Sequence, residues 1–101
     1  MSYIYVVQTN IPADLEAEFN RLYDEEHVPS FLKVPGCHKI TRYRLGKSED
    51  SRMQKYLTIY EVDSPAVVES ETWRKAREYG QWMTTIRPHM TEANRSFFKE
   101  I

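Results

Sequence analysis

The chain has few of the residues that stabilise small secreted proteins or form phosphate-binding loops. It contains one cysteine, Cys37, and three glycines. A single cysteine excludes an intrachain disulfide and fits a reducing compartment, so we expect a cytoplasmic protein. The shortage of glycine excludes a glycine-rich phosphate loop, and with it a bound nucleotide or dinucleotide cofactor. No Gly-x-Ser-x-Gly nucleophile motif occurs either.

Long hydrophobic runs and an excess of positive charge are also absent. No segment approaches the roughly 20 apolar residues that a membrane span requires, and the first residues, Met-Ser-Tyr-Ile-Tyr-Val-Val, lack the basic start of a signal peptide. The formal net charge is −1, with acidic and basic residues interspersed. Nucleic-acid binding needs a basic surface. We therefore expect neither membrane nor nucleic-acid partners.

The metal-ligating residue types do not show the paired spacing of a metal site. His27, His38 and His89 are far apart in the sequence. Glu25 and Glu26 directly precede His27, and consecutive side chains fan out around a helix instead of converging on one ion. We expect no metal ion and no cofactor.

Aromatic residues are abundant. They make up 13% of the chain, as seven Tyr, four Phe and two Trp. Such side chains bury large areas while keeping a polar tip, so they suit interfaces and the walls of small-molecule pockets. A chain of 101 residues is predicted to form a single domain, residues 1–101, with a modest core.

The predicted order of elements is β-α-β-β-α-β. Runs of β-branched and aromatic residues predict strands over 3–8, 37–45, 55–62 and 93–101. An amphipathic helix is predicted over 13–26, ending near His27 because Pro29 follows. Ser64-Pro65 and Ser70 are candidate starts of the second helical region. The path of the segment around Trp82 cannot be placed from the sequence.

This order predicts an α+β, ferredoxin-like fold, in which a four-stranded antiparallel sheet carries both helices on one face. The first strand has Ile4 and Val6 on one side and Tyr3, Tyr5 and Val7 on the other. A sheet face open to water should be polar. Because both faces are apolar here, we expect a second subunit to cover the face without helices, giving a homodimer.

The segment Tyr-Asp-Glu-Glu-His-Val-Pro, residues 23–29, carries the candidate chemistry. A helical wheel of about 100° per residue places Glu26 on the apolar stripe of the first helix, with Tyr23 and His27 beside it. Burial would raise the pKa of the Glu26 carboxyl, and a helix C-terminus would favour the His27 cation. Such neighbours can act as general acid and base. The alternatives are structural: Glu26 turned to water or paired with Arg42, and His27 capping its own helix.

This segment, followed by Val-Pro-Gly and a strand containing Arg-Tyr, resembles the dimeric α+β barrel superfamily, and its EthD-like branch in particular. The resemblance extends over the element order and the Ser-Pro and Glu-Thr-Trp-Arg segments, which is most of the chain. It implies two subunits pairing as a dimeric α+β barrel. Similar members include cofactor-free decarboxylases, cyclases, lactone isomerases and monooxygenases acting on aromatic and polyketide compounds. It also implies a pocket between sheet and helices, faced by the histidine of the His-x-Pro element, here His27.

We therefore predict a cofactor-independent enzyme of lyase, isomerase or decarboxylase type acting on a small aromatic or cyclic metabolite. His27 is the predicted catalytic base, with Glu26 and Tyr23 orienting it or sharing the proton transfer. Two alternatives stay open: a cofactor-free monooxygenase acting on a phenol or quinol, and a non-catalytic dimeric module that binds a small molecule.

Four further side chains are candidates for binding the substrate. Tyr5, Tyr60 and Arg42 lie on predicted strands, and Trp73 lies on the second helix. Arg42 or Tyr5 could donate a hydrogen bond to an enolate oxygen. The roles of His38, Trp82 and His89 are left unassigned.

Overall fold

The computed structural model describes residues 2–101. Its regular elements follow the predicted order, and four strands form one antiparallel sheet in the order β2-β3-β1-β4. The strands are β1 (Tyr3–Asn10), β2 (Cys37–Arg44), β3 (Tyr56–Val62) and β4 (Thr91–Lys99). The α-helices are α1 (Glu16–Leu22), α2 (Val28–Leu32), α3 (Pro65–Val68) and α4 (Glu71–Glu78). The ferredoxin-like α+β fold is confirmed.

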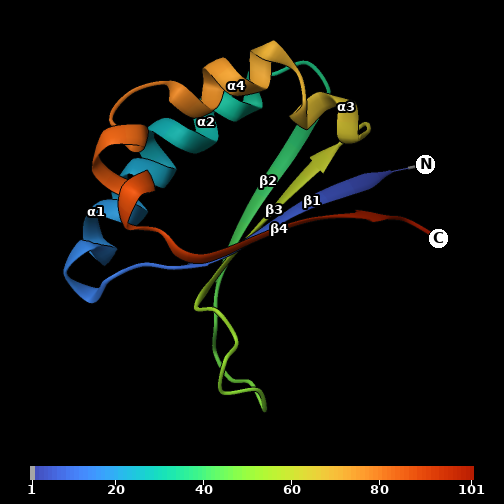
Figure 1. Cartoon of the computed structure of the whole chain (residues 1–101). Helices are drawn as coiled ribbons and strands as arrows, with labels where there is room; N and C mark the ends of the chain where they lie inside the picture. The colour runs from blue at the N-terminus through green and yellow to red at the C-terminus, as the bar shows by residue number, and fades with distance from the viewer. Residues whose placement is uncertain (1) are drawn as a thin grey trace.

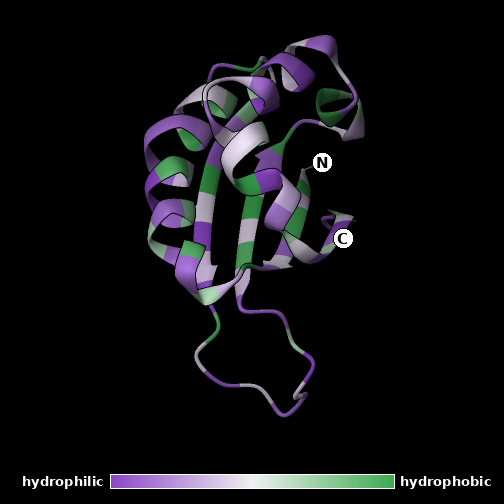
Figure 2. Cartoon of the chain, turned by 60° about the vertical axis from the view of Figure 1, so that its left-hand side comes forward, coloured by the Kyte–Doolittle hydropathy of each residue, from purple (hydrophilic) through white to green (hydrophobic). Residues whose placement is uncertain are grey.

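The helices lie together on one side of the sheet (Figure 1). Alternation along β3 shows which side chains they cover, because Tyr56, Thr58, Tyr60 and Val62 are buried whereas the residues between them are more exposed. Polar residues are frequent on the outer surface of the helices (Figure 2). The connection between β2 and β3, residues 45–55, has no regular structure and extends beyond the sheet (Figures 1 and 2).

The first helical region is longer than the sequence predicted. The prediction that it ends near His27 is wrong, because the chain passes through a π-helical turn, η2 (Tyr23–His27), and continues as α2 to Leu32. The Val28 amide donates to the Tyr23 carbonyl five residues earlier, which is the hydrogen bond of a π-helix. A proline clashes with the carbonyl four residues before it in an α-helix, and the wider turn makes room for Pro29.

The second helical region begins as the sequence predicted. Pro65 opens α3, and the Ser70 hydroxyl accepts a hydrogen bond of 3.2 Å from the Trp73 amide at the start of α4. The segment that could not be placed forms a second π-helical turn, η3 (Trp82–Ile86), and a 3₁₀ turn, η4 (Arg87–His89). The η3 turn packs against α1 and α4, so Trp82 and Ile86 are buried in the core.

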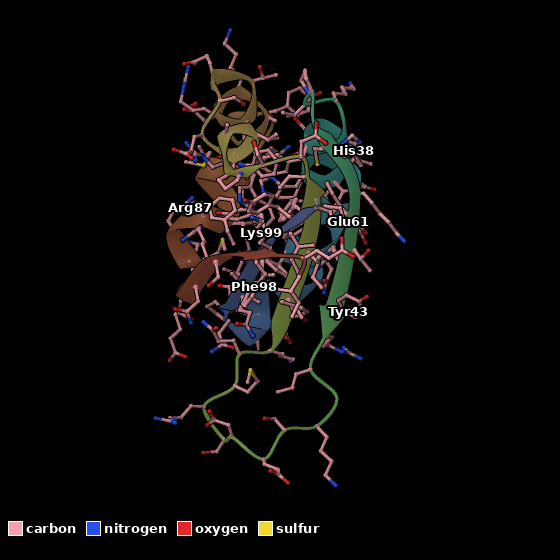
Figure 3. The ribbon with its side chains drawn as sticks, turned by 90° about the vertical axis from the view of Figure 1, so that its right-hand side faces the viewer. His38, Tyr43, Glu61, Arg87, Phe98 and Lys99 are labelled. Carbon is pink, nitrogen blue, oxygen red and sulfur yellow. The ribbon has the colours of Figure 1, made fainter. Side chains whose placement is uncertain are left out.

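The other face of the sheet carries no helix. Side chains that alternate with the buried ones project from all four strands on this side, which we call the open face (Figure 3). Two of them, Tyr43 and Phe98, are 52% and 55% exposed. The apolar members of the open face are Ile4, Val6, Tyr43, Leu57, Ile59 and Phe98.

None of the helices among residues 2–101 is long and apolar enough to cross a membrane. Within the same residues, no cluster of His, Cys, Asp and Glu side chains is suited to hold a metal ion.

Candidate active site

A cavity of about 230 Å³ lies between the helices and the sheet. Most of its wall is aromatic, and three arginines complete it. We call it the aromatic cavity. Its lining residues are Tyr5, Val7, Tyr23, His27, Phe31, Tyr60, Val68, Trp73, Arg77, Trp82, Arg87, Met90 and Arg95.

His27 contributes a buried imidazole to this wall. It lies at the end of the π-helical turn η2 and is 5% exposed. Its ring stacks on Trp82 with a centroid distance of 4.0 Å and an interplanar angle of 20°. The rings of Tyr23 and Phe31 meet it edge-on, at 4.9 and 4.5 Å. Nδ1 of His27 is buried and has no hydrogen-bond partner among the described residues.

The surroundings of His27 disfavour its protonated form. Burial chiefly, and the positive charges of Arg42, Arg77 and Arg87 in addition, lower the pKa of His27 from 6.5 to about 3. The prediction that a helix C-terminus favours the cation is therefore wrong, since the helix continues past the ring and the ring is buried. At neutral pH the imidazole is uncharged, and one ring nitrogen is free to accept a proton.

Two buried tyrosines lie next to the histidine. The hydroxyls of Tyr23 and Tyr60 are hydrogen-bonded to each other. Burial raises the pKa of Tyr23, and both burial and the neighbouring Tyr23 raise the pKa of Tyr60. Both phenols therefore stay protonated at neutral pH, and one of the two hydroxyls donates to the other.

The remaining aromatic candidates also line the aromatic cavity. Tyr5 lies opposite Tyr60 in the sheet, with a ring distance of 5.6 Å, and its ring is 5.9 Å from that of Trp73. Phe31 packs on Trp73 at 4.2 Å. The structure thus brings together His27, Tyr23, Tyr5, Tyr60 and Trp73 from four different elements.

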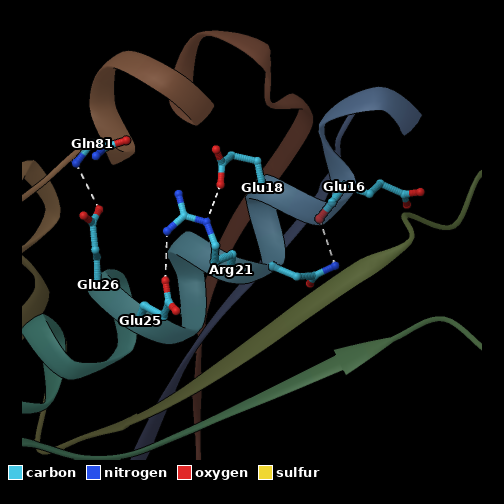
Figure 4. Close-up of polar contacts among 7 residues, drawn as sticks. Glu16, Glu18, Arg21, Glu25, Glu26 and Gln81 are labelled. Carbon is cyan, nitrogen blue, oxygen red and sulfur yellow. Dashed lines mark hydrogen bonds and ion pairs between the residues drawn. The ribbon is translucent and has the colours of Figure 1, made fainter.

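Glu26 does not belong to the lining. Its carboxylate accepts a hydrogen bond of 2.9 Å from the Gln81 amide (Figure 4) and lies over Gly80, where a Cβ atom would meet it at 2.5 Å. Instead of turning into the apolar interior, this side chain fixes the link between α4 and η3. The prediction that Glu26 faces the apolar interior is wrong, because the helical wheel assumed an uninterrupted α-helix where the chain forms a π-helical turn.

Arg42 lies outside the aromatic cavity as well. Its guanidinium donates to Asp24 at 2.8 Å and to Asn20 at 2.6 Å, and it lies over the ring of Tyr23 at 4.4 Å. The side chain is on the far side of that ring, in a separate hollow next to Tyr43. It cannot serve as the donor to a substrate oxygen, and its carboxylate partner is Asp24, not Glu26.

Three arginines that the sequence did not single out line the aromatic cavity: Arg77 on α4, Arg87 in η4 and Arg95 on β4. We call them the arginine cluster. Arg77 follows Trp73 by four residues, which puts both on one helix face. Arg77 could therefore have been predicted from the sequence. Arg95 alternates with Phe97 on the same sheet face. Arg87 lies in a turn with no pattern that predicts its direction.

The single cysteine is not part of this site. Cys37 is buried, and burial raises the pKa of its thiol to about 11. It is not a reactive nucleophile.

Solved structures with the same fold include proteins described with several different activities. An EthD family protein from Bacillus halodurans has a TM-score of 0.71 at 15% identity, with all of both chains covered. The heme-degrader MhuD of Mycobacterium tuberculosis, solved with two hemes in its active site, has a TM-score of 0.72 at 14% identity, covering 98% of this chain and 95% of that one. The cofactor-independent oxygenase SnoaB of Streptomyces nogalater has a TM-score of 0.64 at 18% identity, covering 98% and 92%.

These identities establish a shared fold and no shared activity. They confirm the resemblance to the EthD-like, dimeric α+β barrel superfamily at the level of the fold. Among curated protein sequences, none matches the chain. A family profile described as a domain of unknown function, DUF4286, matches residues 2–100. The chain therefore belongs to the DUF4286 family.

Proposed function

We propose that this protein is a cofactor-independent enzyme that moves a proton on a small aromatic or cyclic metabolite, in a lyase, isomerase or decarboxylase type of reaction. One observation carries the proposal: a neutral, buried imidazole with an unpaired nitrogen lies in the wall of an aromatic cavity. A polar atom buried without a partner costs free energy. A role in binding or catalysis accounts for that cost.

In the proposed reaction, His27 accepts a proton from a carbon next to a carbonyl group. The electron pair of the broken C–H bond moves to the carbonyl oxygen, which becomes an enolate. Tyr5, whose ring lines the aromatic cavity, donates a hydrogen bond to that oxygen. The imidazolium then returns the proton to another atom of the substrate in an isomerisation. Tyr23 and the stacked Trp82 hold the ring of His27 in place.

A cofactor-free monooxygenase is the second candidate, and it is favoured by the structures with a similar fold. SnoaB is described as a cofactor-independent oxygenase. In such a reaction the neutral His27 would take the proton of a phenol or quinol, and the resulting electron-rich anion would react with dioxygen. A third candidate is a non-catalytic module that binds a small molecule in the same cavity.

Heme is a poor match for the aromatic cavity. Its volume of about 230 Å³ is below the range of about 300–1,000 Å³ typical of pockets for drug-sized ligands, and a heme macrocycle is at least that large. The residues therefore fit a ligand with one or two rings, and we propose no step through heme.

The experiment compares the wild-type protein with a His27→Gln variant. Purified, metal-free protein is incubated in D₂O with a panel of aryl ketones, and deuterium uptake at the carbon next to the carbonyl is followed by NMR. We expect exchange with wild type and its loss in the variant. Oxygen uptake with hydroquinones, again lost in the variant, would favour the monooxygenase. Saturable binding without either reaction would leave only the binding module.

We further propose that the protein is a homodimer whose subunits meet through their open faces. Monomeric proteins seldom leave a contiguous apolar patch of this kind in water. Two sheets that pack face to face would bury it, as in a β-sandwich.

A further inference from the structure

We propose that the aromatic cavity selects a carboxylate: the ligand is an aromatic or cyclic carboxylic acid whose anionic group is held by the arginine cluster, with its ring toward His27. The inference rests on the proposed function, since it names the substrate class of that same site.

The arginine cluster has no counter-ion among the described residues. Of the other five arginines, four pair with a carboxylate of the chain at hydrogen-bond distance (Arg21, Arg42, Arg52 and Arg74), and the fifth, Arg44, is exposed to solvent. Among residues 2–101, no carboxylate forms an ion pair with Arg77, Arg87 or Arg95. Three like charges that converge on one cavity repel one another, and a bound anion removes that cost.

Two of the three arginines are partly withdrawn from solvent. Nε of Arg77 is buried without a hydrogen-bond partner in the described part of the chain. Arg87 is half-buried, and burial, with the charges of Arg95 and Arg77, lowers its pKa. A guanidinium presents donors in a planar fork that matches the two oxygens of a carboxylate. Arg77 and Arg87 line the aromatic cavity without a carboxylate partner among the described residues, so their guanidinium groups form a site suited to an anion.

The charged and the aromatic parts of the cavity wall differ in their exposure to solvent. Arg95 is exposed, whereas Trp73, Tyr60 and His27 are each at most 5% exposed. The charged part thus opens to solvent and the aromatic part is closed. A ligand with a ring at one end and an anionic group at the other fits such a cavity in only one orientation, with its ring in the closed aromatic part. This orientation brings the carbon beside its ring or carbonyl group to His27.

An anion there also has a chemical consequence. Arg77 and Arg87 contribute to the positive potential that lowers the pKa of His27. A bound carboxylate offsets that potential and makes the imidazole a stronger base when the substrate is present.

The test uses phenylpyruvate and its methyl ester, which share ring, ketone and methylene but differ in charge. Binding is measured by calorimetry and by quenching of tryptophan fluorescence, since Trp73 and Trp82 line the aromatic cavity. Wild type is compared with Arg77→Gln and Arg87→Gln. Arg52→Gln is the matched control, because it removes the same charge from the exposed β2–β3 connection.

We expect wild type to bind the acid about tenfold or more tighter than the ester. Arg77→Gln and Arg87→Gln should lose most of that preference yet bind the ester as wild type does, which also shows that they fold. Arg52→Gln should keep the preference. Equal affinity for acid and ester, no saturable binding of either, or a preference that survives both substitutions would overturn the proposal.

Two further measurements distinguish a failure of the carboxylate proposal from a failure of the proposed function. If inorganic phosphate binds as tightly as phenylpyruvate, the site recognises negative charge alone. That result would overturn the proposal that its ligand is an aromatic carboxylate. Deuterium exchange at the methylene of bound phenylpyruvate tests the proposed function separately. Tight, arginine-dependent binding without exchange would leave the substrate class standing and remove the enzymatic proposal.

Discussion

The protonation state of His27 is determined by the residues that surround it. In water a histidine side chain is partly protonated near its ordinary pKa of 6.5. Burial against Trp82 and the nearby guanidinium groups keep the imidazole of His27 neutral. Its Nδ1 is buried without a partner among the described residues, and the ring lies in the wall of the aromatic cavity. The structural role of a helix cap, which the sequence left open, does not apply, because the helix continues beyond this residue.

The pH dependence of stability reports this neutral state. Above about pH 6.5 the imidazole is neutral in the folded and the unfolded chain. Below that value the unfolded chain takes up a proton, whereas folded His27 does so only near pH 3, so stability falls as the pH falls. Between about pH 8 and about pH 5 this residue should account for ~2 kcal/mol of the loss in unfolding free energy. A His27→Gln variant should lose correspondingly less.

Urea denaturation at several pH values measures this difference. His89→Gln is the control, because it removes an imidazole that is exposed instead of buried. Parallel slopes for His27→Gln and wild type would contradict a buried, neutral His27.

The tyrosine pair gives a second prediction for single residues. Tyr23→Phe leaves the buried hydroxyl of Tyr60 without the partner that it has in the structure, and should cost about 1–3 kcal/mol in unfolding free energy. The double variant Tyr23→Phe, Tyr60→Phe removes both polar groups and should cost less than the sum of the two single changes. Additive losses in urea denaturation would show that the hydroxyls are not coupled.

The aromatic members of the site could be predicted from the sequence, but most of its charges could not. Alternation along a strand and the spacing of a helix found Tyr5, Tyr60 and Trp73, and the His-x-Pro resemblance pointed to His27. Arg42 was misplaced, because strand alternation gives the correct face but not how far along the sheet a cavity extends. Arg77, Arg87 and Arg95 meet only in three dimensions.

At the scale of elements, the π-helical turn explains the error on Glu26. The buried residues of the first helical region include Phe19, Tyr23, His27 and Phe31, a spacing of four. An α-helix repeats every 3.6 residues, so a wheel drawn on that period drifts away from this face within two turns. The wider π turn keeps every fourth residue on one side, and this delivers His27 to the aromatic cavity.

The link between α4 and η3 offers a test at this scale. Gly80 has a φ of 72°, a conformation that strains an alanine, and a Cβ atom there would displace the Glu26 carboxylate from its hydrogen bond to the Gln81 backbone amide. Gly80→Ala should therefore lower the unfolding free energy by about 2 kcal/mol or more. Gly46→Ala is the matched control, because a Cβ at that position meets nothing within 4 Å. Thermal melts of equal midpoint for the two variants would contradict this account of the link.

At the scale of the whole molecule, the fold was predictable because each strand and helix has its own pattern and the β-α-β-β-α-β order permits few topologies. Strand order, antiparallel pairing and the single helical face follow from that order. The path of η3 and η4 was not predictable, since Trp82 and Ile86 are buried by contacts with distant elements and not by a local periodicity.

The proposed homodimer can be tested through the open face. Phe98→Asp places a charge on this face at a side chain that is 55% exposed, so the subunit should still fold while the dimer weakens by about tenfold or more. Tyr79→Asp is the control, because Tyr79 is 63% exposed on α4's side of the molecule. Sedimentation velocity separates the two species. A monomeric wild type, or equal association of both variants, would contradict the proposal.

The most direct test of the site is an NMR titration of His27 in ¹⁵N-histidine-labelled protein, between about pH 4 and about pH 8, with and without phenylpyruvate. We predict that the ring of His27 stays neutral across this range in the free protein and that its nitrogen shifts change when the acid is added. A ring that titrates near pH 6.5, as an exposed histidine does, and does not respond to the acid would contradict a buried imidazole facing a ligand cavity.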